Sequence, residues 1–137
     1  MRHIKLLFTL AMLMLAIGAN AQELRGSNNS YIGKVESDGT VRNANNRYLG
    51  KIYTDGTIRN SNNAYIGKIE SDGTIRNANN SRIGKVESDG TVRNDRNSYI
   101  GKVESDGTVR NERNATIGKA SGVDRKKAAV LFFFNRF

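Results

Sequence analysis

Residues 31–47 read YIGKVESDGTVRNANNR, and close copies of this 17-residue segment follow one another without an insertion. Four further full copies begin at Tyr48, Tyr65, Arg82 and Tyr99. Partial copies flank the array, because residues 24–30 match the end of a unit and residues 116–119 match the start of one. A strict period of this kind indicates a repeat architecture, in which each unit is one supersecondary element that buries its apolar face only against its neighbours.

Each unit contains two turn signals, which leaves room for two short strands. In the first unit, Ser37-Asp38-Gly39 predicts a three-residue hairpin loop with Gly39 in the left-handed conformation that a type I turn plus G1 bulge requires. The residue pairs that this loop places opposite each other are Glu36 and Thr40, Val35 and Val41, and Lys34 and Arg42. The β-branched residues then share one face and polar residues the other, as expected for a strand with one buried side.

The second turn is marked by paired asparagines, which tolerate positive φ and hydrogen-bond their own backbone. The pairs are Asn45-Asn46, Asn62-Asn63 and Asn79-Asn80. Only one asparagine is left at Arg96-Asn97 and at Arg113-Asn114, which leaves room for a different turn there.

A glycine recurs in each unit at a point where the aliphatic residues do not follow the alternation of inward and outward side chains along a strand. Ile32 and Val35 are three residues apart and would face opposite sides of an ideal strand. Gly33 between them predicts a bulge or a close approach between neighbouring hairpins, either of which lets both aliphatic side chains turn inward. The equivalent glycines are Gly50, Gly67, Gly84, Gly101 and Gly118.

Residues 1–21 have the layout of a secretory signal peptide. Arg2 and Lys5 precede an apolar run over residues 6–17, and small residues follow up to Ala21, after which we expect cleavage. The apolar run is shorter than the ~20 residues that a spanning helix needs. We therefore expect an exported protein, periplasmic or secreted.

The charge balance bears on partners. The 137-residue chain has a net charge of +9, and removal of Arg2 and Lys5 leaves 20 basic against 13 acidic residues, or about +7. An exported basic protein does not meet cellular nucleic acid, so its natural anionic partners are acidic glycans, lipopolysaccharide or a membrane surface. The sequence leaves the oligomeric state open.

The composition argues against catalysis. The chain has no cysteine, and its one histidine, His3, lies in the predicted signal peptide. Thiol nucleophiles, Ser-His pairs and most transition-metal sites are thereby excluded from the mature protein. Each acidic residue recurs once per unit, and symmetric copies do not provide the split pKa values that acid-base catalysis uses. We expect no enzyme activity, no cofactor and no metal.

After the repeat domain, residues 22–120, the pattern dissolves into a C-terminal segment, residues 121–137. Its apolar run, residues 128–134, predicts a core filler or a closing strand for the array. The alternative is superficial membrane attachment through Lys126, Lys127 and the phenylalanine cluster.

The units (Y/R)IGK(V/I)ESDGT(V/I)RNxNN, the preceding signal peptide and the tail containing AAVLFFF resemble the bacterial 5-fold β-flower family. The resemblance implies radially arranged β-hairpins in an exported protein of unknown function, and it carries over no catalytic or binding residues. Tyr53 replaces the glutamate of the other units, and Arg82 and Thr116 replace the tyrosine, so a site built from all units alike would be imperfect.

We therefore predict an all-β fold, a radial, flower- or propeller-like array of five to six short hairpins with a hydrophobic C-terminal strand. Six hairpins would close a ring if residues 24–30 pair with residues 116–119, and five petals remain if they pack otherwise.

The expected function is that of a structural or binding module of the bacterial cell envelope, and the rows of basic side chains then form a solvated face that blunts strand edges. The alternative is multivalent binding of an anionic glycan or lipopolysaccharide, with arginine forks on carboxylate or phosphate and tyrosines as stacking platforms. The candidate ligand-binding residues are Tyr31, Tyr48, Tyr65, Tyr99, Arg42, Arg59, Arg76, Arg93 and Arg110.

Overall fold

The computed structural model describes residues 22–134 and residue 137, and the predicted signal peptide lies outside this part of the chain. The repeats form twelve short strands. These are β1 (Glu23–Gly26), β2 (Tyr31–Val35), β3 (Thr40–Asn43), β4 (Tyr48–Ile52), β5 (Thr57–Asn60), β6 (Tyr65–Ile69), β7 (Thr74–Asn77), β8 (Arg82–Val86), β9 (Thr91–Asn94), β10 (Tyr99–Val103), β11 (Thr108–Asn111) and β12 (Thr116–Ala120).

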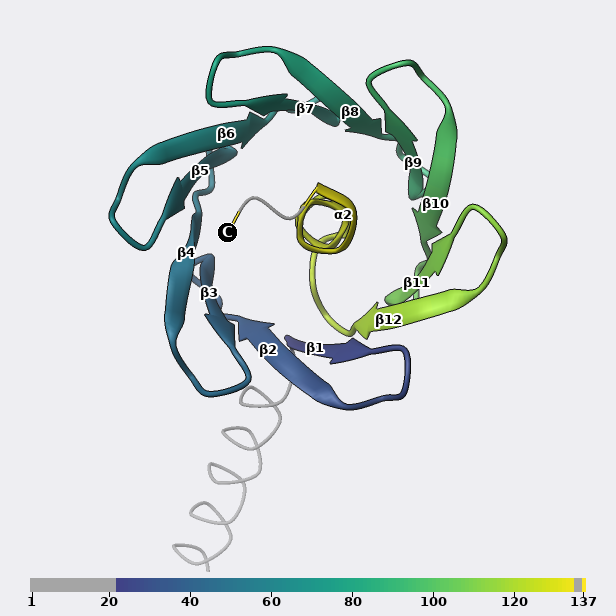
Figure 1. Cartoon of the computed structure of the whole chain (residues 1–137), viewed down its shortest axis with the longest axis horizontal. Helices are drawn as coiled ribbons and strands as arrows, with labels where there is room; N and C mark the ends of the chain where they lie inside the picture. Colours follow the sequence, from purple (N-terminus) through teal and green to yellow (C-terminus); the bar gives the residue numbers. More distant parts are fainter. Residues whose placement is uncertain (1–21, 135–136) are drawn as a thin grey trace, which may run out of the picture.

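The twelve strands form one closed antiparallel sheet, in which every strand pairs with its neighbours in sequence and β1 pairs with β12. At the seam, Leu24 lies opposite Ala120 and Arg25 opposite Lys119. The strands of the two partial copies, β1 and β12, thus close the ring, which has six petals, β1–β2 through β11–β12 (Figure 1). The predicted radial hairpin array is confirmed. Of the two predicted numbers of petals, six is correct, because the pairing of β1 with β12 closes the sheet and leaves no unpaired edge.

The asparagine turns lie at the outer tips of the petals (Figure 1). In the first full unit, Asn46 has φ +66°, and Asn43 Oδ1 accepts hydrogen bonds of 3.0 Å from the backbone N–H of Asn45 and Arg47. Asn97 and Asn114 have the same φ of +66°, so the turns with a single asparagine at the tip do not differ from the others. The physical reason is that the position of Asn45 contributes only its backbone N–H, which arginine also has.

The Asp-Gly loops connect one petal to the next, and their predicted register is confirmed. Val35 lies opposite Val41, Lys34 lies opposite Arg42, and Gly39 has φ +93°. The loop also holds the following petal, because Ile52 N–H donates a 3.0 Å hydrogen bond to the carbonyl of Gly39.

The predicted bulge is present in each petal. In β3–β4, Val41 pairs with Gly50 and Arg42 pairs with Tyr48, so Leu49 is an extra residue with no partner. Leu49 turns toward the core, whereas its counterpart Ile32 remains 43% exposed. The other residues at this position that pack against the core are Ile66, Ile83, Ile100 and Ile117. The bulge also moves the tyrosine to the outer face, opposite the arginine.

The C-terminal segment lies inside the ring as two helical turns, α2 (Arg125–Ala129) and the π-helix η1 (Val130–Phe134) (Figure 1). Ala128, Ala129 and Val130 are fully buried against the β-branched residues of the strands. The core-filling role predicted for this segment is confirmed, but the predicted C-terminal strand is wrong. A closed sheet offers no free edge, so a chain in its interior must satisfy its own backbone hydrogen bonds, and a helix does so.

The inward glycines accommodate the aromatic rings of the tail. A Cβ at Gly101 would lie 2.5 Å from Cε1 of Phe133. Phe132 lies in the same way against Gly118, Phe134 against Gly84 and Phe137 against Gly50. Phe132, Phe133 and Phe134 thus each contact a different petal, and these three petals are adjacent. A π-helix suits this arrangement because its wider turn rotates the chain less from one residue to the next. Neither helix of the described residues is long and apolar enough to cross a bilayer.

Candidate functional site

The outer face of each petal carries an arginine in a fixed set of contacts. Arg42 Nε donates a 2.6 Å hydrogen bond to Glu36 Oε1, and its Nη1 donates to the carbonyl of Asn46 at 3.3 Å. The same guanidinium lies 5.9 Å from the ring centre of Tyr48, within cation-π range. The other arginine–glutamate pairs of this kind are Arg76–Glu70, Arg93–Glu87 and Arg110–Glu104.

The structure distributes the predicted site residues over the petals rather than in one pocket, and it pairs a predicted arginine with a predicted tyrosine in three of them. Cross-strand partners are Arg42 and Tyr48, Arg59 and Tyr65, and Arg93 and Tyr99. Tyr31 pairs with Arg25, and the remaining candidates, Arg76 and Arg110, lie opposite Arg82 and Thr116. Sequence reasoning omitted Arg25, although its place in the first partial copy is that of Arg42 in the full unit.

Most of these arginines already have an internal counter-ion. Arg25 is also paired, since its Nη2 lies 2.8 Å from Glu23 Oε2. Each such glutamate accepts from one side of the guanidinium, which reduces the number of donors left for an external anion. The arginines of the predicted ring of binding sites therefore have fewer free donors for an external anion than the sequence alone indicates.

The second full unit departs from this arrangement. Tyr53 stands where the other units have glutamate, and Arg59 keeps only the hydrogen bond from Nη1 to the carbonyl of Asn63, 3.0 Å. Among the described residues, no carboxylate forms an ion pair with Arg59. A surface hollow of about 400 Å³ lies beside it, lined by Tyr53, Asp55, Thr57, Arg59 and Asn63. The sequence marked Tyr53 as a departure but gave no reason to regard it as a site.

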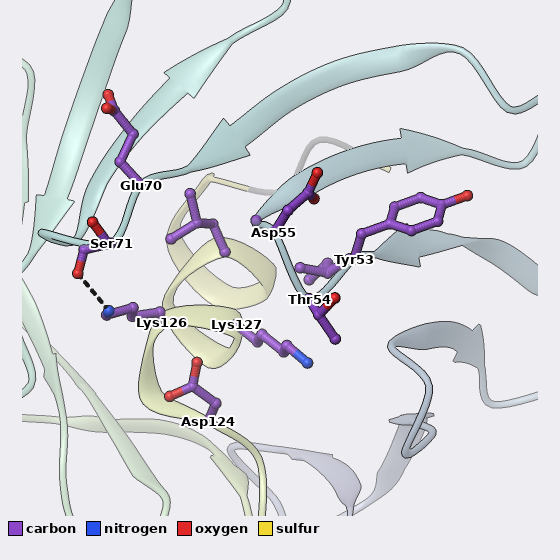
Figure 2. Close-up of a pocket in the computed structure, with 11 residues that line it drawn as sticks. Tyr53, Thr54, Asp55, Glu70, Ser71, Asp124, Lys126 and Lys127 are labelled. Atoms are coloured by element: carbon purple, nitrogen blue, oxygen red, sulfur yellow. Dashed lines mark hydrogen bonds between the residues drawn. The ribbon is translucent and has the colours of Figure 1, made fainter.

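A second hollow lies on the other side of Tyr53, between α2 and the Asp-Gly loops of two neighbouring units. Its volume is about 520 Å³, with Ile52 and Ile69 among its apolar lining residues. Figure 2 shows Lys126 reaching to Ser71, where its Nζ donates a 2.9 Å hydrogen bond to the carbonyl, while the ring of Tyr53 points away from α2.

Charges of both signs line this second hollow. Lys126 and Lys127 lie beside Asp124 at the start of α2, and the carboxylates of Asp55 and Glu70 come from the loop side of the hollow (Figure 2). The opposite charges largely balance, so this hollow does not select an anion.

The loop aspartates are part of the turns. Asp55 Oδ1 accepts a 2.9 Å hydrogen bond from the backbone N–H of Thr57, and this bond is the main reason that the pKa of Asp55 lies below its usual value. The pKa values of Asp38, Asp72, Asp89 and Asp106 are lowered by the same contact in their own loops. These carboxylates are therefore ionised at neutral pH and suited to hold a turn rather than to transfer protons.

The described residues contain no cluster of three or more acidic, histidine or cysteine side chains that would hold a metal ion. The phenylalanines of the tail face the inward glycines of the ring and pack against the core.

Comparison with known proteins places this architecture in a family. Residues 21–136 match the family model described as 5-fold beta-flower protein. The chain belongs to the 5-fold beta-flower family. No curated protein and no solved structure matches the chain closely enough to add to this assignment. The family description is 5-fold, whereas this β-flower has six petals, in a ring that the pairing of β1 with β12 closes.

Proposed function

We propose that this β-flower is an exported, non-enzymatic structural or binding module of the bacterial cell envelope. The proposal draws on the signal-peptide layout of residues 1–21 and on the basic net charge of the chain. Both are properties of a protein that works among the anionic polymers outside the cytoplasm.

The observation that carries the proposal is the division between a filled interior and a charged exterior. The tail occupies the interior, and Val41, Ile58, Val92 and Val109 of the strands are at most 1% exposed. The lysine and arginine rows, by contrast, lie on the outer face, where cross-strand pairs such as Lys34 and Arg42 fix their spacing. Such an arrangement displays side chains on a rigid frame, which favours binding or scaffolding over chemistry in a cavity.

The local use of polar side chains supports a non-catalytic role. The loop aspartates hold Asx-type turns, and the glutamates next to the loops pair with arginines. Each group repeats in the same environment, whereas acid-base catalysis depends on groups whose environments differ.

A more specific candidate is recognition of an anionic glycan or lipopolysaccharide. It is favoured by the pairs of arginine and tyrosine on the petals, since Tyr31, Tyr48, Tyr65 and Tyr99 are 36–40% exposed. A guanidinium beside an aromatic ring suits a ligand that carries both a carboxylate or phosphate and a sugar face. A peripheral membrane role has less support, because the phenylalanines pack inside the ring.

Export is tested by expressing the full chain in a Gram-negative host and separating cytoplasm, periplasm and medium. We expect the protein outside the cytoplasm, with Gln22 as its first residue by N-terminal sequencing and intact mass. A protein that stays in the cytoplasm and retains residues 1–21 would contradict the proposal.

Binding is tested on an array of purified acidic and neutral glycans and lipopolysaccharide at two salt concentrations. Retention on acidic ligands at low ionic strength, reduced by added salt, is the expected result because exposed charges are screened. A lack of retention at low ionic strength would exclude the anionic-ligand candidate and leave the structural role.

A further inference from the structure

Glu36 of the first full unit lies close to two cations that face each other across a hairpin, whereas Glu70, Glu87 and Glu104 each pair with one arginine. Lys34 and Arg42 are direct cross-strand partners on the outer face. Glu36 Oε1 lies 3.8 Å from Lys34 Nζ and 2.6 Å from Arg42 Nε. Like charges that lie directly opposite each other destabilise a sheet, so this carboxylate offsets a built-in repulsion.

The second full unit keeps the two cations and lacks the carboxylate. Lys51 and Arg59 are direct cross-strand partners, and Tyr53 takes the place of glutamate. Lys51 Nζ lies 4.9 Å from the ring centre of Tyr53 and 3.9 Å from Asp38 Oδ2, at the outer limit of an ion pair. Arg59 Nε has no carboxylate acceptor among the described residues, unlike Arg42, Arg76, Arg93 and Arg110.

The hollow beside Arg59 offers the space and the contacts for a ligand. Tyr53 forms one wall and is half-buried, so part of its ring remains available for a sugar face. Thr57, Asn63 and Asp55 line the same hollow, so a hydroxyl, an amide and a carboxylate are available there for sugar hydroxyls. The planar fork of Arg59 matches a carboxylate, and a carboxylate is what the equivalent arginines bind in the neighbouring petals.

We propose that the second full unit is the single high-affinity site of the β-flower for a carboxylate-bearing sugar of an acidic glycan. The ligand carboxylate accepts from Nε–H of Arg59, the donor that Arg42 gives to Glu36 in the first unit, and the sugar ring lies against Tyr53. This inference rests on the proposed binding function and narrows it from a ring of equal sites to one petal.

The experiment is a titration of the 15N-labelled mature chain, followed by NMR, with a trisaccharide of galacturonic acid at low ionic strength. We expect one trisaccharide per chain, with the largest shifts at the amides of Thr57 and Asn63 and at Nε–H of Arg59. The methyl ester of the same trisaccharide, which lacks the negative charges, should bind at least tenfold more weakly. Inorganic phosphate distinguishes a general anion site from a sugar site, and we expect it to bind more weakly than the trisaccharide.

Two loss-of-binding variants have a matched control. Tyr53→Glu restores the carboxylate of the other units and Arg59→Gln removes the fork, and each should weaken binding at least tenfold. Arg113→Gln, which removes an exposed arginine at another petal tip where only the backbone N–H makes a contact, should leave the affinity unchanged. Tyr53→Glu introduces the glutamate that four other units already have at this position, so we expect the variant to fold as the wild type does.

A gain-of-binding variant gives the sharpest test. Glu87→Tyr copies the second-unit arrangement into a petal where Arg93 already faces Tyr99, as Arg59 faces Tyr65. We expect this variant to bind two trisaccharides per chain, with new shifts at Thr91 and Asn97.

Several outcomes would overturn the assignment. Tyr53→Glu binding as tightly as the wild type would place the site elsewhere, while retention of the chain on acidic glycans would still support the broader function. Equal shifts in all petals would favour the multivalent ring, and phosphate binding as tightly as the trisaccharide would exclude a sugar-specific site. If the exported chain binds neither the trisaccharide nor any arrayed glycan, the anionic-ligand candidate fails as well, and the sequenced N-terminus at Gln22 would still support the envelope role.

Discussion

Single glycines determine how closely the tail can approach the sheet. At Gly101 the hydrogen side chain leaves room for the ring of Phe133, and the backbone φ of +158° lies in a region that other residues avoid. The sequence showed these glycines at a fixed period and predicted a bulge or a close approach. The structure contains both, since the bulge precedes the glycine and an aromatic ring covers it in four petals.

Gly101→Ala should therefore destabilise the folded chain by about 1–3 kcal/mol, because the added methyl group would clash with the backbone carbonyl oxygen of Arg110 and with the ring of Phe133. The matched control is Gly26→Ala, whose Cβ would have no neighbour closer than 3.6 Å and should change stability little. Urea unfolding of the two variants measures the difference. Equal midpoints would show that neither the Arg110 carbonyl nor the ring of Phe133 requires a glycine at this position.

The loop aspartates make the free energy of unfolding depend on pH in the acidic range. In the folded chain, hydrogen bonds from backbone N–H groups such as that of Thr40 lower the pKa of each loop aspartate below the ordinary value of 3.8. The unfolded chain therefore binds these protons at a higher pH than the folded chain does. The stabilisation is fully present at neutral pH and is lost as the pH falls from about 4 through the folded-state pKa values.

We expect the urea midpoint of the wild type to decrease between pH 5 and pH 2. A variant with asparagine at all five loop aspartates, Asp38, Asp55, Asp72, Asp89 and Asp106, should show a flatter curve. Parallel curves for the two proteins would assign the acid sensitivity to other groups.

At the scale of elements, the tail shows how closure changes the conformation of a segment. Residues 128–134 have the apolar, aromatic composition of a strand, and an open array would have offered them an edge to pair with. The pairing of β1 with β12 removes that edge, so the segment enters the ring as α2 and η1. The composition indicated burial correctly, and the absence of an edge decided the helical form.

Val130→Asp should prevent stable folding, because Val130 is fully buried among the strand residues of the ring. An uncompensated buried charge costs about 3–5 kcal/mol, a large part of the ~5–15 kcal/mol that stabilises a domain. The control is Arg113→Asp at an exposed petal tip, where only the backbone N–H contacts Asn111. Thermal unfolding followed by circular dichroism compares them, and a cooperative transition in Val130→Asp at the wild-type temperature would contradict the buried position of the tail.

At the scale of the whole molecule, the number of units and the width of the tail are coupled. The diameter of a closed sheet grows roughly linearly with strand number. Twelve strands enclose α2 and η1, and the rings of Phe132, Phe133 and Phe134 pack against three adjacent petals. The diameter of the ring is thus matched to the width of the C-terminal segment that fills it.

Deletion of one unit, residues 65–81, should leave a ring too narrow for the same tail. We expect loss of the cooperative thermal transition and binding of a hydrophobic dye, because the tail is expelled or the ring stays open. The control replaces residues 65–81 by a copy of residues 99–115, which keeps the strand number and should keep the transition. A deletion variant as stable as the wild type would show that the tail adapts to a smaller ring.

The sequence by itself determined the local structure. The register of each hairpin, the left-handed Gly39 and the positive φ of Asn46 all follow from side chains that act within a few residues, and the structure agrees. The repeat also predicted that Lys34 and Arg42 lie opposite each other on the polar face, because a period of two along a strand assigns faces locally. The family resemblance stated from these residues was confirmed over residues 21–136.

Only the tertiary structure decided what depends on contacts between distant segments. The choice of six petals required Leu24 to meet Ala120 across the whole array, and the helical tail followed from that closure. The distinct character of the second unit also emerged only when Glu36 was seen to bridge Lys34 and Arg42, which shows what Tyr53 leaves unbalanced. Local patterns fix φ and register, whereas ring closure, core filling and charge balance depend on where non-neighbouring residues meet.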